Sequence, residues 1–93
     1  MELFIDFEGR LITLSDASRD HAFDHALVSE NLHRFGETHG SPDIHVLSKS
    51  DPRTWMYYKY YPDFGTGGKY LCIVVKKLLE EAYISTAYVT RIK

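Results

Sequence analysis

A pair of histidines on one predicted helix has the spacing to do chemistry. His21 and His25 are four residues apart, so a helix places both imidazoles on one face. Such a pair can bind a metal, but no third ligand follows at an obvious spacing and the motif HExxH is absent. The histidines could also be solvated or cap a helix, or they could transfer protons, because imidazole titrates near neutral pH.

A lysine among tyrosines is the second chemical feature. Lys59 stands in the middle of "YYKYY", and the strongly apolar "GGKYLCIVVKK" follows after a short loop. Lysines contact phosphates and aromatic rings stack on bases, so this combination on a sheet is typical of binding to single-stranded RNA or DNA. Alternatively, the tyrosines simply cover the sheet, with their hydroxyl groups in water.

The elements that must position these residues are a hairpin, a helical segment and a sheet. Alternating residues around Glu8 and Gly9 predict a β-hairpin in residues 1–14. The absence of glycine and proline from Ser15 to Phe35 predicts a helical segment, 15–38, which "GETHGSPD" ends. Strands are predicted at 44–48, 54–61, 69–77 and 83–92. We therefore expect one α+β domain over residues 1–93, with its antiparallel sheet in 44–93.

Alternation along these strands predicts which side chains share a face. The apolar set expected beneath the helix is Leu71, Ile73, Val75, Ala87 and Val89. The set expected together on an open face is Lys59, Lys76, Thr86 and Tyr88.

Composition and charge indicate a small soluble protein. Of 93 residues, 44% are hydrophobic and 26% charged, and no apolar run is long enough to span a bilayer. The acidic N-terminus does not resemble a secretion signal, and the single Cys72 cannot form an intrachain disulfide, so we expect a cytoplasmic protein. Residues 1–50 carry four cations and nine acids, whereas residues 51–93 carry seven cations and four acids. The basic half could form a surface that faces a polyanion, or its charge could serve only to keep the protein in solution.

Several segments, in their order, resemble a known nuclease superfamily. "SRDHAFDH", "SPD", "YYKYY", "GTGGKYLCIVVK" and "STAYVT" resemble small phage and bacterial domains of the barnase/EndoU/colicin/RelE-like nucleases, over about residues 15–93. The resemblance implies an N-terminal helical segment on a four-stranded antiparallel sheet. It also implies metal-independent RNA cleavage, often by a toxin, in which a 2′-hydroxyl attacks the adjacent phosphate and a cyclic phosphate is left.

Site residues carry over from this resemblance position by position. The implied catalytic residues are His21 or His25, Lys59, Lys76 and Thr86. The substrate-binding residues would be Tyr57, Tyr61, Lys69 and Tyr88. Ala26 stands where the superfamily pattern has proline after the second histidine.

Two functions are therefore open at this point. The first is an endoribonuclease without cofactor or metal, whose partners would be single-stranded or ribosome-associated RNA and an antitoxin protein. The second is a non-catalytic module that binds RNA or protein. No membrane partner is expected, and the free edge of the N-terminal hairpin could pair with a second copy.

Overall fold

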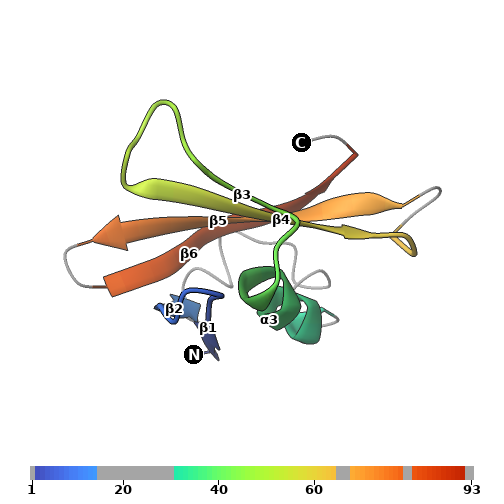
Figure 1. Cartoon of the computed structure of the whole chain (residues 1–93), viewed down its shortest axis with the longest axis horizontal. Helices are drawn as coiled ribbons and strands as arrows, with labels where there is room; N and C mark the ends of the chain where they lie inside the picture. Colours follow the sequence, from blue (N-terminus) through green and yellow to red (C-terminus); the bar gives the residue numbers. More distant parts are fainter. Residues whose placement is uncertain (1, 15–30, 65–67, 79–80, 92–93) are drawn as a thin grey trace.

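The computed structural model describes residues 2–14, 31–64, 68–78 and 81–91, which form one sheet and one helix. The strands are β1 (Glu2–Ile5), β2 (Leu11–Leu14), β3 (Ile44–Leu47), β4 (Thr54–Tyr61), β5 (Lys69–Leu78) and β6 (Glu81–Thr90), and the helix is α3 (Leu32–Gly40). Figure 1 shows α3 and the β1–β2 hairpin on the same side of the long strands β4, β5 and β6. The fold is thus a small, sheet-rich α+β arrangement.

The sheet has six strands in the order β1-β2-β6-β5-β4-β3. The predicted antiparallel strands are present as β3 to β6. The prediction of a four-stranded sheet is wrong, because the sheet has six strands. The hairpin extends the sheet, because β2 pairs in parallel with β6 through Ile12 opposite Ala82 and Thr13 opposite Tyr83. This pairing joins segments about 70 residues apart in the chain, which strand periodicity cannot predict.

The described helix, α3, overlaps the end of the predicted helical segment 15–38. It includes Gly36 and ends at Gly40, two residues beyond the predicted end. A glycine in a helix costs about 1 kcal/mol relative to alanine. Burial of Phe35, Thr38 and His39 against the sheet and hairpin outweighs that cost. Residues 15–30, which include most of the predicted helical segment, lie outside the described residues.

The core lies between the sheet and α3, as the alternation of β5 predicted. Leu71, Ile73 and Val75 are fully buried on the helix side, and their partners on β6 lie beside them. The remaining core side chains are Ile12, Leu14, Phe35, Tyr57, Tyr61, Ala82, Ile84 and Ala87. A β-bulge between Val74 and Val75 interrupts the register of β5 and β6, so Thr86 pairs with Val74 and Ile84 with Val75.

Within the described part of the chain, no helix has the length and apolar character needed to cross a membrane.

Candidate nucleic-acid interface

The sheet separates Lys59 from the other predicted phosphate-binding residues. Lys59 pairs with Leu71, a core residue of the helix side, and its Nζ donates a hydrogen bond to the Ser41 carbonyl (2.9 Å). Lys69, paired with Tyr61, belongs to the same side of the sheet. The prediction that Lys59 shares an open face with Lys76, Thr86 and Tyr88 is therefore wrong.

Lys76, Thr86 and Tyr88 do share a face, opposite to the helix. Thr86 pairs with Val74, and Tyr88 with Cys72, and both partners alternate with the helix-side residues of β5. Tyr88 is 42% exposed, and Lys76 is also exposed. These three predicted residues therefore lie on one face of the sheet, and Lys59 lies on the other.

Two of the predicted base-stacking tyrosines are core residues. Tyr57 is fully buried, and its hydroxyl donates to Asp6 Oδ2 (2.7 Å); burial and this carboxylate raise the pKa of Tyr57. Tyr61 is 8% exposed and donates to Glu37 Oε1 (2.9 Å), and burial raises its pKa to about 12. Their positions do not agree with stacking on a base.

The helical histidines His21 and His25 lie outside the described residues, so their proposed proton transfer stays a prediction. His39, by contrast, is described and fully buried. Its Nδ1 lies 2.8 Å from the Phe35 carbonyl oxygen, and burial lowers its pKa to about 4. His45 stacks on Tyr57 with ring centres 4.5 Å apart, and burial lowers its pKa as well. The buried His39 imidazole is therefore not placed to exchange protons with a ligand in solvent.

A concentration of cations stands at the end of the sheet where β4 begins and β5 ends. The strands bring Arg53 beside Lys77, since the Lys77 amide donates to the Arg53 carbonyl (2.8 Å). The hairpin adds Arg10 through the parallel pairing of β2 with β6. We call this region the basic end, defined by Arg10, Arg53, Lys76 and Lys77.

Two adjoining hollows open at the basic end. The first has a volume of about 190 Å³ and is lined by Arg10, Leu11, Trp55, Lys77, Glu81 and Ala82. The second has a volume of about 130 Å³ and is lined by Asp51, Arg53, Lys76, Lys77 and Tyr83. Lys77 borders both hollows, so one extended ligand could occupy the two together.

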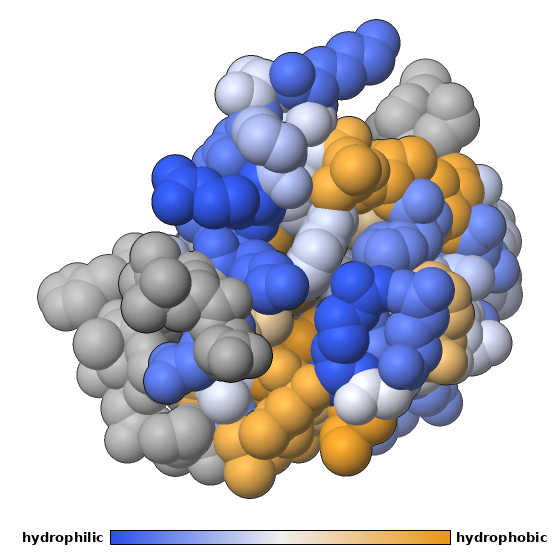
Figure 2. Space-filling model, turned by 60° about the vertical axis from the view of Figure 1, so that its left-hand side comes forward, coloured by the Kyte–Doolittle hydropathy of each residue, from blue (hydrophilic) through white to orange (hydrophobic). Residues whose placement is uncertain are grey.

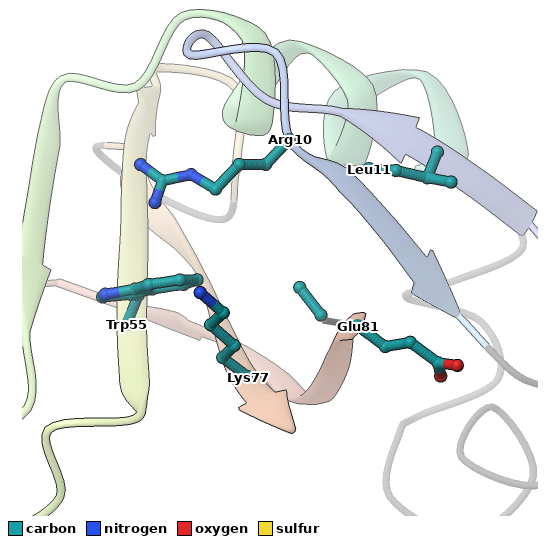
Figure 3. A pocket seen from close by; sticks show the side chains of 6 residues that line it. Arg10, Leu11, Trp55, Lys77 and Glu81 are labelled. Carbon is teal, nitrogen blue, oxygen red and sulfur yellow. The ribbon is translucent and has the colours of Figure 1, made fainter. Parts of the chain in front are cut away.

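Aromatic rings accompany the cations in both hollows. The Arg10 guanidinium carbon lies 4.6 Å from the centre of the Trp55 ring, a cation–π contact. Figure 3 shows the Arg10 and Lys77 side chains reaching toward Trp55, whereas the Glu81 carboxylate points away from it. Tyr83 lines the second hollow.

Carboxylates lie closer to the arginines of the basic end than to its lysines. Arg10 forms ion pairs with Asp6 (3.1 Å) and Glu8, and Arg53 Nε lies 3.8 Å from Asp51 Oδ1. Hydrogen bonds from the Arg53 amide and the Thr54 hydroxyl lower the pKa of Asp51. In the described ranges, no carboxylate lies within 4.0 Å of the ammonium of Lys76 or Lys77.

The surface as a whole is not uniformly charged. Figure 2 shows one side of the molecule, on which hydrophilic side chains separate two hydrophobic areas. Exposed apolar residues include Leu11, which lines the first hollow, and Leu47, which pairs with Trp55. A ligand at the basic end would therefore meet cations beside apolar and aromatic surface.

Sequence reasoning found Lys76 in this region but missed Arg10, Arg53, Trp55 and Lys77. The adjacent lysines "KK" and the strand that begins "RTW" were visible signals of a basic strand end. No local pattern indicated Arg10, because only the pairing of β2 with β6 carries the hairpin to this end.

Comparison with known proteins found no match to this chain among family models, curated proteins or solved structures.

Proposed function

We propose that this protein binds single-stranded nucleic acid at the basic end, without chemistry on the ligand. The observation that carries the proposal is the joining of the two hollows at Lys77, with Lys76 and Arg53 in one and Trp55 in the other. The ammonium groups of Lys76 and Lys77 can neutralise phosphates, and the rings and guanidinium offer stacking surfaces.

Lys76 extends this site toward the face opposite the helix. It lies on the same face as Thr86 and Tyr88, whose exposed ring could stack on a further base. A flexible single strand could follow such a path, whereas a small molecule would fill one hollow only.

The proposal predicts a defined dependence of affinity on salt. Two phosphate contacts, at Lys76 and Lys77, give a slope of about −1.4 in a plot of log affinity against log salt concentration. The affinity should then fall about sevenfold between roughly 50 and 200 mM salt. Trp55 is the single tryptophan of the chain and lies in the site, so its fluorescence can report the binding.

The experiment is a titration of the protein with unlabelled RNA and DNA oligonucleotides of the same sequence. Lys76→Ala and Lys77→Ala should each weaken binding and make the salt slope shallower by about 0.7. Lys59→Ala is the matched control, since Lys59 contacts Ser41 on the helix side. Affinity that does not respond to salt would contradict the phosphate contacts at Lys76 and Lys77, and absence of binding would contradict the proposed function. Comparison of the RNA and DNA arms shows whether the 2′-hydroxyl contributes.

The ribonuclease activity implied by the resemblance stays a prediction. The described residues support binding more than cleavage, because Lys59 and Thr86 lie on opposite sides of the sheet. Incubation of RNA with the protein in EDTA tests the activity directly. If the RNA is cleaved, and His21→Ala or His25→Ala abolishes the cleavage, the protein is an enzyme and the proposal of binding alone is wrong.

A further inference from the structure

A buried aspartate connects the N-terminal hairpin to the basic end. The Asp6 side chain is completely buried, and its two oxygens accept four hydrogen bonds. Oδ1 accepts from the amides of Glu8 (2.9 Å) and Arg10 (2.8 Å). Oδ2 accepts from the Arg10 Nε (3.1 Å) and the Tyr57 hydroxyl (2.7 Å). The carboxylate therefore ties the turn of the hairpin to a core residue of β4.

These bonds also determine where the Arg10 guanidinium lies. With Nε held by Asp6 and the terminal nitrogen paired with Glu8, the guanidinium is positioned over the Trp55 ring. Its positive charge is compensated by two carboxylates, while its side chain remains 33% exposed. Such a guanidinium is poorly suited to neutralise a phosphate, but its plane can stack on a base.

The hollow beside this guanidinium has walls and a size that suit a nucleic-acid base. Leu11 and Ala82 provide apolar walls, and Lys77 stands at the same hollow. The volume of about 190 Å³ suits one planar group rather than several nucleotides. Lys77 would then bind the phosphate next to the bound base.

We infer that, within the nucleic-acid site proposed above, Asp6 is a positioning residue that makes Arg10 a stacking platform, so that this hollow takes one unstacked base while Lys76 and Lys77 hold phosphates. The inference assigns different roles to Arg10 and to the two lysines of the basic end. Arg10 contributes to affinity without contributing to the salt dependence, whereas the two lysines contribute to both.

The test compares the salt slopes of variants in the same fluorescence titration with oligonucleotides. Arg10→Ala should weaken binding about tenfold and leave the slope unchanged, because a stacking contact releases no counterions. Lys77→Ala should make the slope shallower by about 0.7. Asp6→Asn keeps an oxygen that can accept from the two amides but replaces Oδ2, so binding should weaken as in Arg10→Ala. The Asp6→Asn/Arg10→Ala double variant should lose no more than Arg10→Ala alone.

Failure of the inference is distinguishable from failure of the proposed function. If the unaltered protein does not bind the oligonucleotides, the proposed function is wrong. If it binds, and Arg10→Ala changes the slope as Lys77→Ala does, Arg10 contacts a phosphate and the inference is wrong. Unchanged affinity in Arg10→Ala overturns it too. Circular dichroism and urea unfolding identify the conditions in which Asp6→Asn is folded, and Arg10→Ala tests the stacking role independently of that variant.

Discussion

Acidification should destabilise this protein through His39. The imidazole is fully buried, and burial lowers its pKa from 6.5 to about 4. The unfolded chain therefore binds a proton near pH 6.5, whereas the folded protein binds it only near pH 4. Between these values protonation favours the unfolded state. The stability that neutral His39 contributes is fully present above pH 6.5, falls as the pH decreases, and is lost by about pH 4.

The expected loss follows from the difference between the two pKa values. A difference of about 2.5 units corresponds to about 3 kcal/mol of unfolding free energy once the pH is below both values. At pH 5 the loss from His39 is about 2 kcal/mol relative to pH 7.5. The lowered pKa of His45 acts in the same direction. The expected loss is a large part of the roughly 5–15 kcal/mol of unfolding free energy that is typical of folded domains.

Urea unfolding followed by circular dichroism at several pH values between 5 and 7.5 measures this loss. His39→Gln should flatten the pH dependence, whatever it does to the absolute stability. His33→Gln is the matched control, because His33 lies on the same helix but is exposed. Equal unfolding free energies at pH 5 and pH 7.5, or an unchanged pH dependence in His39→Gln, would refute the reasoning.

Two further substitutions probe the packing that supports the site. Tyr57→Phe removes the hydroxyl that donates to the buried Asp6 carboxylate, and should cost about 1–3 kcal/mol in urea unfolding; a change below about 0.5 kcal/mol would mean that this bond contributes little. Gly9→Ala and Gly68→Ala both place alanine at positive φ, 87° and 81°, which costs about 1–2 kcal/mol. Gly68→Ala should cost more, because its new methyl group would overlap the Tyr60 hydroxyl, whereas nothing lies within 4 Å at Gly9. Equal thermal stabilities of the two glycine variants would contradict that packing.

Local patterns in the sequence determined most of the individual strands. The hairpin, and the strands predicted at 54–61 and 69–77, agree with β1, β2, β4 and β5 to within one or two residues. Alternation also identified Leu71, Ile73 and Val75 as the core face. These predictions succeed because side chains alternate with a period of two within any strand, whatever the strand pairs with.

Tertiary structure alone decided which side chains meet. Alternation within a strand does not reveal how that strand is aligned with its neighbour, and a shift of one residue exchanges the two faces. The pairing of Lys59 with Leu71 thus placed this lysine on the helix side, away from Lys76. The parallel pairing of β2 with β6 brought Arg10 to Trp55 and Lys77. Both outcomes depend on contacts between segments that are distant in the sequence. The residue pattern of one segment does not predict such contacts.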